Sequence, residues 1–151
     1  MLGGINNCPA LFEQKGLKIM DRLAQIAQRV AAGDVFTIKK PIKFKPEGST
    51  MNAVFNARLI HDAGYEFAAG TVHYEDQFGG IQSIDVFFRR GDELVSHTFK
   101  GFNCGYGGEG PHGLVEFSEL FGIGLSKNKI MDHDYRASLS PKASFDLQQM
   151  F

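Results

Sequence analysis

Glycine is concentrated in the segment from Gly101 to Leu114, which holds six of the chain's 18 glycines. Each glycine loses much backbone entropy on folding, so such a cluster indicates positive φ angles or a close approach of another group to the backbone. Pro111 stands where proline is favoured, in the first turn of a helix, so the preceding loop should end in free backbone N–H groups. Such groups and the helix dipole attract anions. The segment predicts a loop that binds a phosphate-bearing small molecule.

Side chains in and around this loop could complete a nucleotide site. Tyr106 could stack on a base. Glu109 could accept hydrogen bonds from a ribose or a base, although its carboxylate would repel a phosphate. Arg58 and Lys100 would supply positive charge. The predicted ligand-binding residues are Arg58, Lys100, Asn103, Tyr106, Gly107, Gly108, Glu109, Gly110 and His112. The alternative is that the glycines only permit a sharp turn onto a sheet.

Catalytic patterns are weaker in this sequence. The loop lacks the lysine and the serine or threonine of a P-loop. Cys104 and His112 could form a nucleophile and its base, but no third, orienting group is evident. Histidines with acidic neighbours could hold a metal, yet none lies in a spaced motif; these are His61–Asp62, His73 with Glu75 and Asp76, and Asp132–His133–Asp134. We therefore expect no catalytic residue, no metal and no cofactor.

Length and composition are those of a globular domain. The chain has 151 residues, 43% of them hydrophobic and 22% charged, with a net charge of −1. We expect one domain over residues 1–151, in which residues 1–16 and 138–151 could be loop-like arms. The near-neutral charge provides no basic field for duplex DNA, duplex RNA or an anionic membrane. No run is apolar enough to cross a bilayer and residues 1–10 lack a secretion signal, so we expect a cytoplasmic protein.

Periodicity predicts the elements that position the loop. Apolar residues recur at three- and four-residue steps between Leu17 and Ala32, which predicts a helix ending near Gly33. The period then changes to two, which predicts strands joined by turns at residues 35–38, 42–45, 52–61, 65–75, 81–90 and 94–100. Another helix is expected from Leu114 to Phe121. Residues 52–61 could instead be a helix capped by Ser49 or Thr50.

The predicted fold class is α+β, an antiparallel β-meander of about five strands with an N-terminal helix and a second helix after the Gly-rich loop. One helix cannot cover both faces of such a sheet, so we expect a homo-oligomer that buries the second face with Phe78, Phe87, Phe99 and Phe102. A basic cluster is interpreted as a solvated rim that protects an edge strand; it comprises Lys39, Lys40, Lys43 and Lys45.

The string Gly105-Tyr106-Gly107-Gly108-Glu109-Gly110-Pro111, followed by Leu114, resembles the GYGGxGPxxL signature of small bacterial and phage-encoded domains of unknown function. The likeness covers residues 99–122 and implies no assigned chemistry. More loosely, in architecture and size, the chain is similar to phage anti-defence proteins that act as sponges for cyclic nucleotide or cyclic ADP-ribose immune signals. That likeness implies a binding role in the cytoplasm of a host cell and transfers no functional residue.

Three functions remain open from the sequence. The first is non-enzymatic binding of a nucleotide-like, phosphate-bearing small molecule, as in a phage protein that sequesters a signalling nucleotide. The second is a metal-assisted phosphodiesterase that uses the histidines. The third is a protein–protein interaction module in which the glycine loop is structural. Sequestration needs tight binding alone, which suits a chain with no convincing catalytic group.

Overall fold

The computed structural model describes residues 11–38 and 42–151, and of residues 11–20 it describes the backbone alone. Lys39 and Lys40 of the basic cluster lie outside the described residues. The chain forms two compact units, one up to Val35 and the other from Phe36 to Phe151, and each is described by itself. Among the described residues, no helix is long and apolar enough to cross a membrane.

In the described part of the first unit, residues 11–35, the chain forms one helix, α1 (Leu11–Ala31). It includes the helix predicted from the apolar periodicity, which is confirmed, and begins several residues earlier. Gly33 follows the helix with a left-handed φ of 72°, and its N–H donates to the Val30 carbonyl at 3.0 Å. A residue with a side chain would be strained there, so the glycine terminates the helix as expected.

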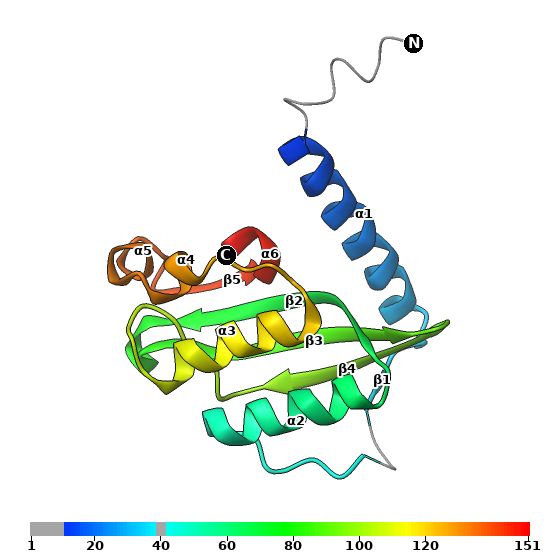
Figure 1. The fold of residues 1–151 in the computed structure, drawn as a ribbon. Helices are drawn as coiled ribbons and strands as arrows, with labels where there is room; N and C mark the ends of the chain where they lie inside the picture. The colour runs from blue at the N-terminus through cyan, green and yellow to red at the C-terminus, as the bar shows by residue number, and fades with distance from the viewer. Residues whose placement is uncertain (1–10, 39–41) are drawn as a thin grey trace. The chain divides into compact units, whose positions relative to one another are not determined.

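The second unit is built on a five-stranded sheet in the order β1-β4-β3-β2-β5 (Figure 1). Its strands are β1 (Phe36–Thr37), β2 (Glu66–Glu75), β3 (Gly80–Arg90), β4 (Glu93–Phe99) and β5 (Lys142–Asp146). β2, β3 and β4 form the predicted meander, and β5 pairs antiparallel with β2. β1 pairs parallel with β4, and Phe36 lies opposite Val95. The prediction of a pure antiparallel meander was therefore wrong, although the α+β class is confirmed.

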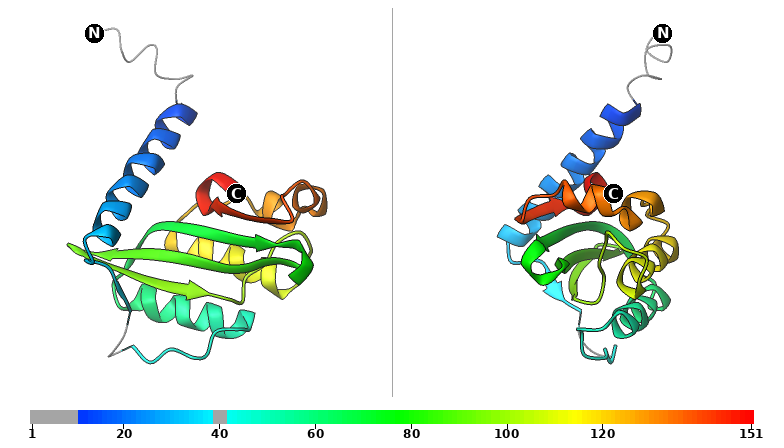
Figure 2. Two further views of the ribbon diagram at one scale, coloured as in Figure 1. Left: turned by 180° about the vertical axis from the view of Figure 1, so that it is seen from behind. Right: turned by 90° about the vertical axis from the view of Figure 1, so that its left-hand side faces the viewer.

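Two longer helices, α2 (Thr50–Asp62) and α3 (Glu109–Phe121), lie side by side over one face of the sheet (Figures 1 and 2). α3 contains the helix predicted over residues 114–121 and starts inside the glycine-rich segment. The short helices are η2 (Asp76–Phe78), α4 (Lys127–Met131), α5 (His133–Ala137) and α6 (Leu147–Met150).

α2 corrects the prediction of a strand at residues 52–61. Ser49 caps the helix, because its side-chain oxygen accepts a hydrogen bond from the Asn52 N–H at 3.2 Å. Ala53, Ala57 and Ile60 are buried at helical spacing, whereas Phe55 is exposed. The spacing of apolar residues in this segment fits both the two-residue period of a strand and the 3.6-residue period of a helix. Burial against α3 and the sheet selects the helix.

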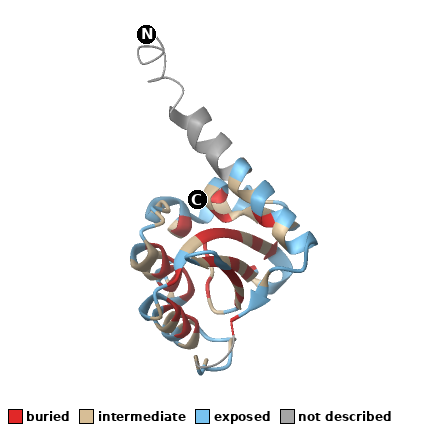
Figure 3. Ribbon diagram, turned by 90° about the vertical axis from the view of Figure 1, so that its right-hand side faces the viewer, coloured by how far each residue is buried: buried red, intermediate tan, exposed pale blue. Residues whose placement is uncertain are grey.

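The core lies between this helical layer and the sheet, where the buried residues gather (Figure 3). Alternate residues of β3, namely Ile84, Val86 and Phe88, are fully buried beneath the helices. Phe117 of α3 packs edge-on or tilted against several other phenylalanine rings, including Phe99 at 5.3 Å between centroids. Aromatic pairs of this kind add to the stabilisation that apolar burial gives.

The C-terminal segment packs against β2 and contributes to this core. Residues 138–151, for which a loop-like arm was considered, contain β5 and α6. Leu147 and Met150 of α6 are buried, as is the terminal Phe151. Gly70 of β2 permits this packing, since a Cβ there would lie 3.1 Å from Leu147 Cδ2.

Candidate functional site

The glycine-rich segment connects β4 to α3, and close packing accounts for three of its six glycines, Gly101, Gly105 and Gly113. A side chain at Gly101 would overlap the Ser49 backbone carbonyl, and one at Gly113 would overlap Thr50. Gly105 has a φ of 85°, and a Cβ there would overlap the Arg136 side chain. Gly101 and Gly113 therefore allow the glycine-rich segment and α3 to pack against the start of α2. At these three positions the glycines have a structural role, because a side chain would not fit.

Asn103 fixes the conformation of the segment. Its Oδ1 accepts hydrogen bonds from the N–H groups of Ile81 and Cys104, each at 2.9 Å, and its Nδ2 donates to the Gly79 carbonyl at 3.0 Å. The side-chain amide thus joins the loop to the turn before β3. Because Asn103 uses its polar atoms on backbone partners, its role here is to shape the site.

The first turns of α2 and α3 line one cavity of about 490 Å³. The Thr50 hydroxyl donates to the Gly101 carbonyl at 2.7 Å and so ties the start of α2 to the loop before α3. The residue that precedes α3 is Gly108, which has no side chain to cap the helix. The first-turn N–H groups of Glu109 and Gly110 have no intrahelical acceptor, as is general at a helix start. Residues at the N-termini of both helices therefore line the same space.

Charged and aromatic side chains surround this cavity. Lys100 contributes a cation, and its backbone N–H is held by the Glu47 carboxylate at 2.9 Å. Two aromatic rings in its wall are solvent-exposed, Phe78 at 71% and Tyr106 at 41%. Glu109 also lines the cavity, so its carboxylate lies beside the helix N-terminus that would bind an anion. The cavity can accept a planar ring beside a charged group, with Glu109 disfavouring anions close to it.

Five of the nine predicted ligand-binding residues line this cavity, namely Lys100, Asn103, Tyr106, Glu109 and Gly110. The others do not. Arg58 of α2 forms an ion pair with Glu116 of α3 on the exposed surface of the helical layer. His112 is exposed on α3 outside the cavity lining. Gly107 has open space around it, and Gly108 lies against the ring of Tyr106.

Other lining residues come from distant parts of the chain and were not predicted from the sequence as part of a site. They include Ser49 and Thr50 at the start of α2, Phe78 in η2 and Gln82 in β3. The capping pattern at Ser49 was a usable signal, because a helix at residues 50–62 would have indicated a second N-terminus. Nothing in the local sequence indicates that Phe78 lies beside the loop.

The cysteine and histidine considered as a catalytic pair are unsuited to that role. Cys104 is 1% exposed, and burial raises the pKa of its thiol to about 11, against a smaller opposing effect of Arg136. A thiol with such a pKa is protonated at neutral pH and is a poor nucleophile. Its oxidised and metal-bound forms are disfavoured for the same reason, and we assign Cys104 to the core.

Of the histidines with acidic sequence neighbours, His73 has a different acidic partner, whereas His61 stays close to its neighbour. His73 bonds Asp85 of the adjacent strand, with Nε2 and Oδ2 2.8 Å apart, rather than Glu75 or Asp76. His61 Nδ1 lies 3.3 Å from Asp62 Oδ1 at the exposed end of α2. Among the residues that the structure describes, no group of three or more histidine, cysteine or acidic side chains is arranged to hold a metal ion.

Known proteins do not indicate a function for this chain, so the function is inferred from the geometry of the cavity. No family model matches the chain, and no curated protein or solved structure is significantly similar to it.

Proposed function

We propose that this protein binds a nucleotide-like, phosphate-bearing small molecule, without altering it, in the cavity between the N-termini of α2 and α3. The observation that carries the proposal is the meeting of two helix N-termini in one cavity that also presents Lys100 and two exposed aromatic rings. Helix N-termini favour anions, and aromatic faces favour nucleobases irrespective of their identity.

Each part of such a ligand has a suitable group in the cavity. The phosphate would accept hydrogen bonds from the first-turn N–H groups of α3 and pair with the Lys100 ammonium. The base would stack on Tyr106 or Phe78. Glu109 would accept hydrogen bonds from a ribose or base, and its carboxylate would weaken phosphate binding at the neighbouring first-turn N–H groups.

In biological terms, the proposal is a protein that sequesters a signalling nucleotide, such as a cyclic nucleotide or cyclic ADP-ribose in an infected bacterial cell. Sequestration requires affinity and no chemical step, so the cavity needs donors, charge and stacking surfaces alone. A protein-binding module is the second candidate, and the tight packing at Gly101, Gly105 and Gly113 supports it.

The test is a thermal-shift series with cyclic oligonucleotides and cyclic ADP-ribose, followed by heat release and mass spectrometry of the ligand. A ligand at about 100 times its Kd should stabilise the fold by ~2.7 kcal/mol. Recovery of intact ligand is expected; altered products would indicate an enzyme. No thermal shift with any nucleotide would favour the protein-binding module.

Three variants locate the site. Lys100→Ala and Tyr106→Ala should each weaken binding by about tenfold or more, since a charge-assisted contact or a stacked base contributes roughly 1–3 kcal/mol. Lys127→Ala is the matched control, because Lys127 is an exposed lysine of α4 outside the cavity lining, and it should leave the affinity unchanged. Equal effects of all three variants would show that binding is non-specific.

A further inference from the structure

A chain of hydrogen bonds crosses four neighbouring strands on the face of the sheet opposite α2 and α3. It joins Thr98 of β4, Asp85 of β3, His73 of β2 and Ser144 of β5, in the same order as the strands lie in the sheet. Both the histidine and the aspartate alternate along their strands with residues buried in the core, such as Val72 and Ile84, and so point to the other side.

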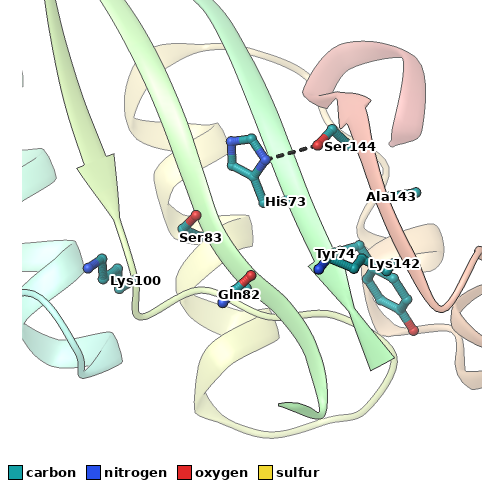
Figure 4. Close-up of a pocket in the computed structure, with 8 residues that line it drawn as sticks. All are labelled: His73, Tyr74, Gln82, Ser83, Lys100, Lys142, Ala143 and Ser144. Atoms are coloured by element: carbon teal, nitrogen blue, oxygen red, sulfur yellow. Dashed lines mark hydrogen bonds between the residues drawn. The ribbon is translucent and has the colours of Figure 1, made fainter. Parts of the chain in front are cut away.

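The distances in this chain are those of well-formed hydrogen bonds. The Thr98 hydroxyl donates to Asp85 Oδ1 at 2.6 Å, and Asp85 Oδ2 lies 2.8 Å from His73 Nε2. His73 Nδ1 lies 2.9 Å from the Ser144 hydroxyl oxygen, the bond drawn in Figure 4. All three distances fall within the usual range for such bonds.

The partners determine which ring nitrogen carries the proton. Asp85 can only accept when ionised, so His73 Nε2 is the donor to Asp85. In the neutral ring Nδ1 then has a free lone pair, and the Ser144 hydroxyl donates to it. Asp85 thereby orients the histidine, and Thr98 holds Asp85 through its other oxygen. A serine, its base and an orienting carboxylate are thus present in the order that activates a serine hydroxyl.

Ser144 is accessible to a substrate. It is exposed, and together with His73 it lines an open cavity of about 780 Å³. Lys142, Gln82 and Lys100 line the same cavity, and Lys100 and Lys142 lie on opposite sides of it (Figure 4). The cavity lining therefore carries two lysines, which would favour a negatively charged substrate.

We propose that Ser144 is the nucleophile of an esterase site for small carboxylic esters that carry a negative charge. Ser144 Oγ bonds to the ester carbonyl carbon as its proton passes to His73 Nδ1, and the carbon–oxygen bond to the leaving group then breaks as that group takes the proton from His73. Water, losing a proton to His73, next attacks the acyl-serine, and the carboxylic acid leaves as His73 returns the proton to Ser144. Lys142 and Gln82, which line the same cavity, would donate to the oxyanion.

This activity goes beyond the proposed nucleotide binding and does not rest on it. The two cavities share Lys100 and Gln82, whereas Tyr106 belongs to the first alone and Ser144 to the second alone. Variants at Tyr106 and Ser144 therefore test the two proposals separately.

The experiment uses the full chain with a fluorophosphonate probe and with 4-nitrophenyl succinate and 4-nitrophenyl acetate as substrates. Peptide mapping should place the probe on Ser144, and the anionic succinate ester should be the better substrate. Ser144→Ala and His73→Ala should lower the hydrolysis rate by about 100-fold or more, the usual contribution of a nucleophile or general base. Ser96→Ala is the matched control, because Ser96 is a half-buried serine of β4 outside this cavity. It should retain the full rate.

Asp85→Asn tests the positioning role by its pH profile. The variant should lower the rate and change its pH dependence, because the amide can donate to His73 and favour the wrong tautomer. If Ser144→Ala fails to fold, Ser144→Cys in a Cys8→Ser background tests whether His73 activates the side chain at position 144. The thiol introduced at position 144 should react with iodoacetamide faster than Cys104, and His73→Ala should slow that reaction. Labelling of a residue other than Ser144, or rates unaffected by His73→Ala, would overturn the proposal and leave the chain of hydrogen bonds as a structural link between β5 and the sheet.

Discussion

Individual glycines of the segment between β4 and α3 differ in what a side chain would meet. A Cβ at Gly107 has nothing within 4 Å, whereas one at Gly101 would overlap the backbone carbonyl of Ser49. A backbone atom cannot move aside as the end of a flexible side chain can, so the two positions should respond differently to the same substitution. The contrast separates glycines that the fold requires from one that it does not.

We expect Gly101→Ala to lower the free energy of unfolding by about 1–3 kcal/mol, as overpacking does in a well-packed core. Gly107→Ala should change it by less than ~0.5 kcal/mol, as is usual for surface substitutions. Urea denaturation followed by far-UV circular dichroism measures both. Equal effects of the two substitutions would contradict the packing assigned to this segment.

At the scale of elements, the extended segment before α2 is fixed to the sheet through one half-buried carboxylate, that of Glu47. Glu47 Oε2 accepts hydrogen bonds from His97 Nε2 at 2.9 Å and Asn56 Nδ2 at 2.6 Å, and Oε1 accepts from the Lys100 N–H. Burial by itself would raise the pKa of Glu47, but these hydrogen bonds outweigh it, and the pKa lies below its usual value of 4.5. Asn56 also bonds the backbone of Lys45 through both of its side-chain polar atoms.

This arrangement predicts a pH-dependent contribution to stability. Because the pKa of Glu47 is lower in the folded than in the unfolded state, its contribution is complete above the unfolded value of about 4.5 and is lost as the pH falls through the folded value. Glu47→Gln should cost roughly 1–3 kcal/mol at pH 7, from hydrogen bonds to a charged acceptor, and progressively less below pH ~4.5.

Chemical denaturation of Glu47→Gln and the parent chain between pH 7 and pH 3.5 measures this difference. Glu119→Gln is the control, because Glu119 is an exposed carboxylate of α3, and its cost should be small throughout. A cost of Glu47→Gln that stays constant over the whole range would show that the ionised carboxylate is not what stabilises the segment.

At the scale of the whole molecule, the unit from Phe36 to Phe151 contains a complete core of its own. The buried cluster runs from Ile38 to Phe151 and, among the residues whose burial is described, includes none of the first unit. Two of the four phenylalanines that suggested self-association, Phe99 and Phe102, belong to this cluster. The homo-oligomer stays a prediction. Of the other two, Phe78 is exposed and Phe87 is half-buried, so both remain at least partly accessible to a second subunit.

We expect a fragment of residues 36–151 to fold without the first unit and to unfold in one cooperative transition. A fragment of residues 36–146 is the matched control; it lacks Leu147, Met150 and Phe151, which are buried. Losing buried side chains of this size costs about 2–5 kcal/mol each, which approaches the whole stability of a small domain. Thermal melts and the dispersion of amide NMR signals distinguish the two fragments, and cooperative folding of both would show that α6 is dispensable.

Local sequence patterns predicted the helices and strands whose apolar residues recur at regular spacing on one face. The apolar stripe of α1, the alternation of β3 and the turns on either side of it were all present in the sequence. The structure confirms them, although α1 begins several residues before the predicted Leu17. Glycine density and Pro111 also identified the loop that leads into α3. For α1 and β3, the period of the apolar residues matches one secondary structure, helix or strand, better than the other.

Tertiary structure alone decided the elements and contacts that depend on distant residues. Residues 52–61 fit a strand or a helix by pattern, and contacts of Ala53, Ala57 and Ile60 with the core made them a helix. The pairing of β5 with β2 brought Ser144 to His73, 71 positions earlier in the chain. Likewise, the start of α2 joined the glycine-rich loop only through packing. Local preference is a weak force beside burial and pairing between segments that are far apart in sequence, so these arrangements could not be read from any one stretch.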